Sequence, residues 1–204
     1  MTIFFEIDLV IRQFQQAMAA IRYSAKPVVA APFEMTLGGG AEVCLPASSI
    51  QASLETYIGL VETGVGLIPG GGGNKELYLR HVEATSATSG PELQKAANQT
   101  FETIAMAKVS TSAHEAFTNH FFSERDGVVI NDMAVIARAK QEVLHLAQAG
   151  YRPPLREKNS GCRRARVCND ATRCEIDEIR RNDFGARFKN CRKARIRHCW
   201  RACS

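Results

Sequence analysis

The 204-residue chain lacks the features that mark several protein classes. It has no apolar run near the ~18 residues of a membrane span, so we expect no membrane partner. Its start, MTIFFEIDLV, carries Glu6 and Asp8 and no basic leader, which argues against a secretory signal. Hydrophobic residues make up 45% and charged residues 23% of the chain, as in ordinary globular proteins. These features exclude membrane, collagenous and coiled-coil classes and predict a cytoplasmic protein.

Several catalytic motifs are also missing. Gly73 is followed by Asn74 where a phosphate-binding loop needs lysine, and neither a dinucleotide-binding G-x-G-x-x-G nor a G-x-S-x-G nucleophile elbow occurs. Four histidines of the first 158 residues show no metal-ligand spacing, so we expect ordinary structural roles for them and no metal site. They are His81, His114, His120 and His145.

Charge and cysteine are distributed unevenly and divide the chain. Residues 1–158 hold 13 Lys and Arg against 16 Asp and Glu, whereas residues 159–204 hold 13 against 5. Six of the seven cysteines lie in the second part. We therefore predict a domain over 1–158 and an Arg/Cys-rich tail over 159–204, and treat them separately.

The first part alternates helical patterns with short apolar strands, which favours an α/β fold. We expect a helix over 7–23, with Phe14 on its apolar stripe, and a short one after Gly40 to Pro46. Further helices are expected to Arg80 with Asn74 as the N-cap, from Pro91 to about Lys108, over 112–121, and from Asn131 or Asp132 to Gln148, where Gly150 ends the last. We expect strands over 27–33, 49–53 and 127–130, with residues 55–73 as a glycine-rich loop.

Two glutamates stand beside the glycine-rich turns. Glu42 follows Gly38-Gly39-Gly40, and Glu62 lies in the next glycine-rich loop. Two carboxylates from different elements can divide acid and base work, and the N–H groups of a glycine turn can hold an oxyanion. The alternative is that the glycines serve turns and both glutamates are solvated, which the residues alone leave open.

The segments KPVVAAPFEMTLGGGAEVCLPAS and GLVETGVGLIPGGGG resemble the centre of the crotonase (enoyl-CoA hydratase/isomerase) superfamily. From about Val10 to Lys158 the chain is most similar to the branch in which this domain accompanies a 3-hydroxyacyl-CoA dehydrogenase. The resemblance implies a partial crotonase fold with short parallel strands and flanking helices. It also implies an acyl-CoA substrate and enoyl-CoA hydratase (lyase) activity in fatty-acid β-oxidation.

The resemblance also implies residue roles. Gly39 resembles the oxyanion donor to the thioester carbonyl, shaped by Gly38 and Gly40, and Glu42 and Glu62 resemble the pair that adds water across the double bond. No cofactor is implied, and NAD would be needed only by a separate dehydrogenase domain. The implied partners are a homo-oligomer or such a dehydrogenase domain.

The sequence departs from the family pattern in two ways. The second oxyanion N–H and much of the coenzyme A pocket come from a region upstream of Met1, and Val61 replaces a frequent proline before the second glutamate. We therefore expect impaired activity from this fragment, and a non-catalytic acyl-CoA-binding or assembly role is the alternative. An incomplete sheet would also expose an apolar edge.

Four interpretations compete for the tail, which has 11 Arg, two Lys and no Leu. Gaps of five, five, sixteen, seven and three residues between its cysteines do not match zinc spacings, and a disulfide framework needs an oxidising compartment. A basic nucleic-acid-binding arm follows from charge alone, and we do not favour it. We favour a shifted reading frame, because permitted codons read one nucleotide back give a helical, family-like ending. Such a tail should be disordered.

Overall fold

A computed structural model of the chain describes residues 2–155, with side chains from Phe5 onward. All predictions about the tail, including its cysteines, its charge and its frame, fall outside these residues. Within them, no helix is both long enough and apolar enough to cross a membrane.

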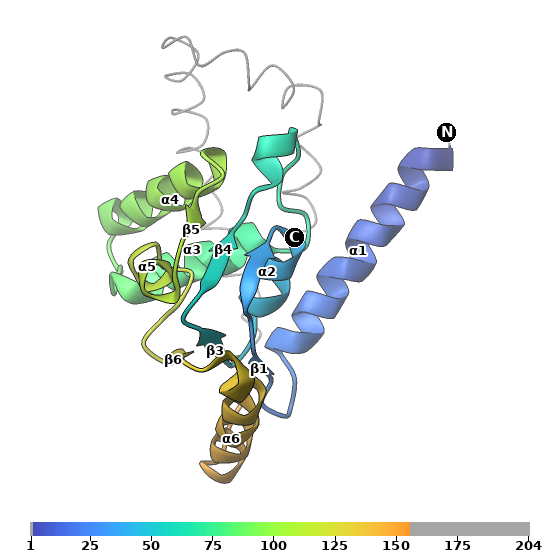
Figure 1. Cartoon of the computed structure of the whole chain (residues 1–204). Helices are drawn as coiled ribbons and strands as arrows, with labels where there is room; N and C mark the ends of the chain where they lie inside the picture. Colours follow the sequence, from blue (N-terminus) through green and yellow to red (C-terminus); the bar gives the residue numbers. More distant parts are fainter. Residues whose placement is uncertain (1, 156–204) are drawn as a thin grey trace.

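Two three-stranded sheets form the centre of the structure (Figure 1). The first has the order β1-β3-β6 and is parallel; its strands are Val29–Ala30, Ser49–Ser53 and Gly127–Val129. The second has the order β2-β4-β5, with strands Glu34–Leu37, Thr56–Gly59 and Val109–Ser110. β2 and β4 are parallel, and β5 is antiparallel to β4. The predicted α/β class with short parallel strands is confirmed.

Helices surround the sheets. Helix α1 (Thr2–Arg22) lies along one side next to α2 (Gly39–Cys44), whereas α4 (Gly90–Ala105) and α5 (Ala113–Thr118) lie on the opposite side (Figure 1). Helix α3 (Gly73–Ala84) packs against α2 and α4, and α6 (Val135–Gln148) packs against β1 and β3. Two 3₁₀ turns complete the order, η1 (Glu62–Val65) and η2 (Asp132–Ala134).

The structure corrects the predicted strand over 27–33. Only β1 is extended there; the chain then leaves the first sheet and enters β2 of the second, with Glu34 at φ +50 at the junction. Such a backbone conformation is uncommon for a residue with a side chain, and it allows the abrupt change of direction. The apolar run therefore supplies only β1, and the strand of the second sheet begins directly after it.

Two further predictions were wrong. The segment 55–73 is not all loop, because β4 occupies its start and pairs with β2. Asn74 is not the N-cap of α3: that position belongs to Gly72, and Asn74 instead donates its amide to the Pro69 carbonyl at 3.1 Å. The two-residue strand β5 was not predicted, since two residues carry no detectable periodicity.

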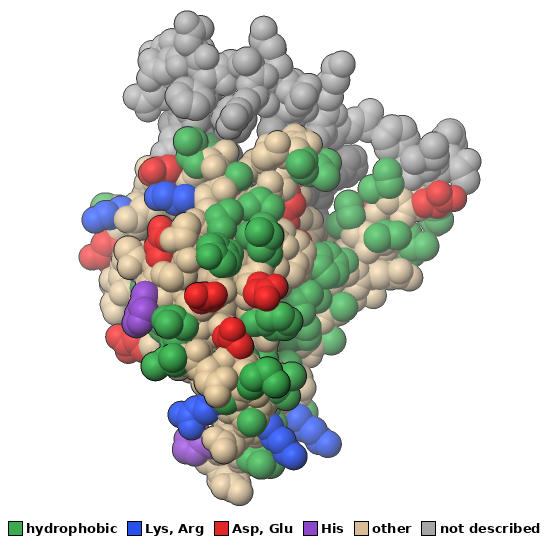
Figure 2. Space-filling model, in the orientation of Figure 1, with side chains coloured by type: hydrophobic (Ala, Val, Ile, Leu, Met, Phe, Trp, Pro, Cys, Tyr) green, Lys and Arg blue, Asp and Glu red, His purple; other side chains and the backbone are tan. Residues whose placement is uncertain are grey.

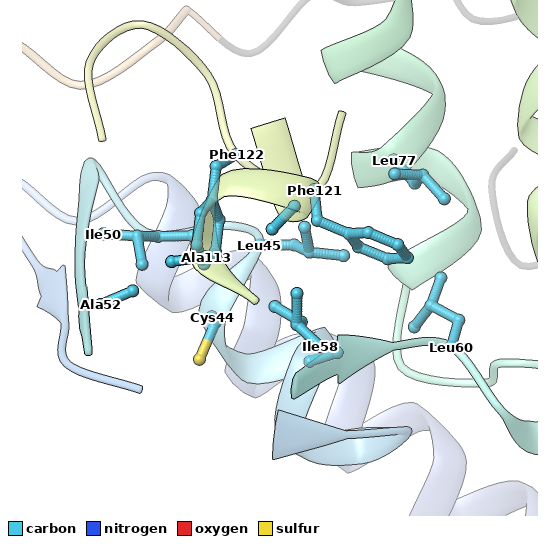
Figure 3. Close-up of a cluster of buried hydrophobic side chains, with 12 residues drawn as sticks. Cys44, Leu45, Ile50, Ala52, Ile58, Leu60, Leu77, Ala113, Phe121 and Phe122 are labelled. Atoms are coloured by element: carbon cyan, nitrogen blue, oxygen red, sulfur yellow. The ribbon is translucent and has the colours of Figure 1, made fainter. Parts of the chain in front are cut away.

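The apolar core joins α2, both sheets, α3 and the segment after α5 (Figure 3). Its largest fully buried side chains include Leu45, Ile50, Ile58, Leu60, Leu77 and Phe121. Leu45 follows α2 directly, so burial of this residue anchors the end of the helix that carries Glu42.

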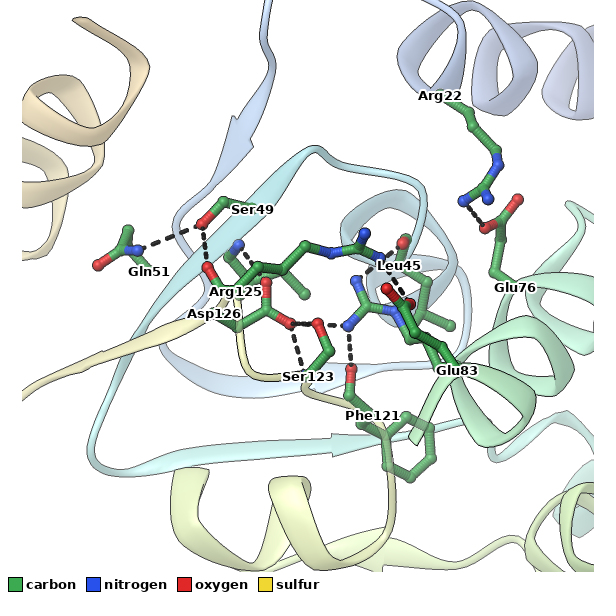
Figure 4. Close-up of polar contacts among 12 residues, drawn as sticks. Arg22, Leu45, Ser49, Gln51, Glu76, Glu83, Phe121, Ser123, Arg125 and Asp126 are labelled. Carbon is green, nitrogen blue, oxygen red and sulfur yellow. Dashed lines mark hydrogen bonds and ion pairs between the residues drawn. The ribbon is translucent and has the colours of Figure 1, made fainter. Parts of the chain in front are cut away.

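A buried ion pair also holds the end of α2 in place (Figure 4). Arg80 of α3 donates to Asp126 at 2.7 Å and to the carbonyl of Leu45 at 3.0 Å. Asp126 also accepts the Ile50 N–H at 2.7 Å. These bonds tie the end of α2 to α3 and β3.

Candidate active site

The glycine triplet forms the turn between β2 and α2. Gly38 takes φ +55 and donates its N–H to the Gly59 carbonyl at 2.8 Å, which continues the β2–β4 ladder. The first intrahelical bond of α2 runs from the Glu42 N–H to the Gly38 carbonyl at 3.0 Å. Gly39 and Gly40 therefore lie in the first turn, where helix N–H groups have no intrahelical acceptor. Both glycines are exposed in the described chain, and N–H groups of such a turn can hold an oxyanion.

Glu42 is buried in this first turn, with only 3% of its surface exposed. Its Oε1 accepts the N–H groups of Gly71 at 2.9 Å and Gly73 at 2.8 Å, and its Oε2 lies 3.0 Å from the Gly71 nitrogen. Burial raises the pKa of Glu42, and the backbone N–H groups oppose that rise because they stabilise the carboxylate. The run Pro69–Gly73 thus forms a cradle for one carboxylate.

Glu62 begins the turn η1 and lies close to Gly38. A Cβ added to Gly38 would be 3.3 Å from Glu62 Oε1, so the side chain lies directly against this glycine. Burial is the main cause that raises the pKa of Glu62, and the negative charge of Glu42 adds to it. The two carboxylates therefore influence each other across the glycine turn.

One oxygen of the Glu62 carboxylate, Oε2, is unusual because it lacks a hydrogen bond within residues 2–155. Glu62 Oε2 is buried and has no hydrogen-bond partner among the described residues. Buried acceptors are almost always paired, and an exception in a native structure calls for an explanation. An acceptor oxygen in this state is suited to take a proton or a hydrogen bond from a substrate or its water.

The five predicted site residues thus lie together, at the junction of β2, α2 and η1. They are Gly38, Gly39, Gly40, Glu42 and Glu62. Among residues 2–155 there is no group of three or more His, Cys, Asp or Glu side chains able to hold a metal ion. His81 is buried in α3 against His120 and away from solvent, so it is a structural residue of the core rather than a surface histidine.

Comparison with solved structures places this arrangement in a known fold. The enoyl-CoA hydratase of Bacillus anthracis matches with a TM-score of 0.53 and 22% identity, over 70% of this chain and 48% of that one. A "putative enoyl-CoA hydratase" from Thermobifida fusca YX, in complex with acetoacetyl-CoA, matches with a TM-score of 0.51 and 21% identity, over 85% of this chain and 64% of that one. The described part of the chain therefore has the crotonase fold of these enoyl-CoA hydratases.

Curated relatives extend the match at the level of sequence. A Bacillus subtilis (strain 168) protein named "Probable 3-hydroxyacyl-CoA dehydrogenase" is 57% identical over 155 residues, which are 76% of this chain and 19% of that protein. A Rickettsia felis "Putative fatty acid oxidation complex trifunctional enzyme" is 40% identical over 77 residues, or 38% of this chain and 11% of that protein. No family model matches the chain. The chain spans about a fifth or less of the length of these curated relatives.

The sequence did not reveal the residues that contribute to this site through their backbone or through packing. Gly71 and Gly73 were assigned to a loop, yet their N–H groups bind Glu42. Phe14 was assigned to an apolar stripe of α1, yet its ring lies against Gly39 and Gly71. The run of four glycines was the one available signal for the cradle, because glycines permit close backbone approach.

Proposed function

We propose that the chain carries an enoyl-CoA hydratase-type site, which adds water syn to the double bond of a 2-enoyl-CoA in fatty-acid β-oxidation. The observation that carries the proposal is that the Gly38–Gly40 turn brings both glutamates together: Glu42 lies in the first turn of α2 and Glu62 lies against Gly38. Isomerase members of the superfamily typically keep one of the two glutamates, so the presence of both favours hydration.

The chemistry needs three groups in one place. The water oxygen bonds to the β-carbon while one glutamate removes its proton, and the other glutamate supplies a proton to the α-carbon. Negative charge develops on the thioester oxygen, where the Gly39 N–H would donate. Loss of one such donor typically costs ~10²–10³ in rate. In this scheme the chain itself uses no metal or redox cofactor.

The raised pKa values of Glu42 and Glu62 suit the two proton transfers of this reaction. A carboxyl group that gives up or takes a proton near neutral pH works best when its pKa lies above that of a free glutamate. Burial supplies that change for both side chains. The backbone bonds favour the ionised form of Glu42, whereas Glu62 Oε2 is left for the reacting molecule.

The names of the curated relatives support a place beside a dehydrogenase. Hydration yields a 3-hydroxyacyl-CoA, and both relatives are named for the dehydrogenation of such a thioester or for fatty acid oxidation. We therefore propose an acyl-CoA substrate and association with a dehydrogenase domain, where NAD would act.

The test is the hydration of crotonyl-CoA by the full chain, followed by the loss of absorbance of its conjugated thioester. Glu42→Gln and Glu62→Gln should each lower kcat by about 10²–10⁴, because each removes one proton-transfer group. Glu55→Gln, an exposed glutamate of the same segment, is the matched control and should leave the rate unchanged. A Glu62→Gln variant as fast as its parent would reject the proposal.

A non-catalytic role is the alternative result of the same experiment. Because the chain spans about half of the Bacillus anthracis hydratase, it could bind acyl-CoA without turning it over. Calorimetry with crotonyl-CoA would then detect binding by the parent while no hydration is seen. That outcome would assign the chain to thioester binding or assembly.

A further inference from the structure

Helix α1 contacts the glycine cradle through adjacent residues. Gln15 donates its side-chain amide to the Gly70 carbonyl at 2.8 Å, and a Cβ added to Gly70 would be 4.0 Å from Cγ2 of Ile11. Near the end of the helix, Arg22 forms a 2.5 Å ion pair with Glu76 of α3. Helix α1 is therefore docked on the same loop that binds Glu42, and it runs beside α2 (Figure 1).

Phe14 lies at the centre of this contact. A Cβ added to Gly71 would be 2.3 Å from the ring atom Cε1 of Phe14 and 2.9 Å from Glu42 Oε2. A Cβ added to Gly39 would be 3.8 Å from Cζ of the same ring. One aromatic ring thus touches both the proposed oxyanion turn and the cradle of the carboxylate.

We propose that Phe14 is a positioning residue for Glu42: its ring sets the spacing between the Gly39 turn and Gly71, and so holds the Gly71 N–H on the carboxylate. The proposal rests on the proposed function for its catalytic meaning, but the contact itself is a property of the folded chain.

The space around Gly71 explains why the ring can have this effect. The position that a Cβ of Gly71 would occupy lies between the ring and the Glu42 carboxylate, so a side chain there would displace one of them. If the ring were removed, the backbone at Gly71 would lose the surface that presses it toward Glu42. Gly73 would keep its bond at 2.8 Å, since it lies at the start of α3 and does not depend on Phe14.

The two amides therefore provide a readout that separates positioning from general loosening of the fold. An N–H bonded to a carboxylate changes its proton chemical shift when that carboxylate is protonated. In the parent, the Gly71 and Gly73 amide protons should both follow one titration, which Glu42→Gln abolishes and Glu62→Gln does not. This can be measured by NMR on the full chain without any substrate.

In Phe14→Ala, the Gly71 amide should lose most of its pH-dependent shift, whereas the Gly73 amide keeps its own. Phe14→Leu retains apolar bulk without the ring atom that reaches Gly39, and it should show a smaller loss. Met18→Ala is the matched control, because Met18 is buried on the same face of α1 one turn further on. It loosens the packing of α1 to a similar degree and should leave both amides unchanged.

The outcomes are distinct. An unchanged Gly71 signal in both Phe14 variants would overturn the proposal, as would an equal loss in Met18→Ala. If Phe14→Ala does not fold, Phe14→Leu decides alone. If the chain hydrates crotonyl-CoA, Phe14→Ala should lower kcat/KM by about 10²-fold, the effect of a small misplacement in a catalytic site. A chain that shows the NMR signature without hydration would reject the proposed function and keep the positioning role of Phe14.

Discussion

At the residue scale, the site uses one side-chain type in two environments. Glu42 is buried and Glu62 is half-buried; three short contacts from backbone nitrogens reach Glu42, whereas the buried Glu62 Oε2 receives no hydrogen bond from the described residues. Hydrogen bonds to a carboxylate favour its ionised form, and burial favours its neutral form. Two glutamates of identical chemistry can therefore take different parts in proton transfer.

A buried histidine gives a second residue-scale prediction, on pH. Burial lowers the pKa of His81 to about 4 from its ordinary 6.5, against the opposing effect of its Nδ1 bond to the Leu77 carbonyl. As pH falls below 6.5 the unfolded chain binds a proton at this ring, whereas the folded chain stays neutral until about pH 4. The free energy of unfolding should therefore fall through that window, by on the order of 3 kcal/mol.

Urea unfolding at a series of pH values measures this effect. His81→Gln should flatten the slope between pH 6.5 and 4, while His145→Gln, an exposed histidine on α6, should keep the slope of the parent. Equal slopes in the parent and His81→Gln would show that the acid sensitivity comes from carboxylates instead.

At the scale of elements, the shortest strands depend on the strands beside them. Two-residue strands such as β1 and β5 have almost no intrinsic stability, and they form because neighbouring strands supply the hydrogen-bond partners. Helix ends depend more on local residues. We expected Pro91 to start a helix and Gly150 to end one; Pro91 lies in the first turn of α4, and Gly150, at φ +78, follows the end of α6. Local end signals are visible in a sequence, but sheet pairing is not.

The capping box of α4 provides the element-scale prediction. The Ser89 side chain and Glu92 satisfy each other's backbone N–H groups, and these bonds lower the pKa of Glu92. Ser89→Ala should lower the free energy of unfolding by about 1 kcal/mol, because one N–H of the first turn loses its acceptor. Thr88→Ala, whose side chain is outside the box, is the control in the same urea titration. A loss of equal size in both variants would contradict a capping role.

At the scale of the whole molecule, the described chain leaves large apolar side chains in contact with solvent. Phe5 is 71% and Val10 63% exposed on α1, and hydrophobic side chains follow this helix in Figure 2. Met35 on β2 and Ile136 on α6 are also exposed. An exposed apolar patch such as the one along α1 marks a site of association or aggregation.

We therefore expect the chain to self-associate as its concentration rises. Sedimentation velocity should show species larger than the 22.4 kDa monomer, and the double variant Ile7→Glu, Val10→Glu should shift the distribution toward the monomer. Gln13→Glu, Gln16→Glu adds the same charge on exposed polar positions of α1 and should have a smaller effect. A parent that sediments as a monomer at every concentration would contradict this expectation.

By itself, the sequence determined which residues stand beside the glycine turns, the α/β class and most helix ends, because these depend on local patterns and on neighbours a few positions away. Only the tertiary structure decided that the run after Lys26 supplies only β1 before the chain enters a second sheet, that Gly71 and Gly73 bind Glu42, and that Phe14 touches both glycine turns. These contacts join positions about 25 to 57 residues apart through backbone groups and ring faces, which all residues or all aromatics share. Their partners are therefore chosen by packing rather than by local sequence.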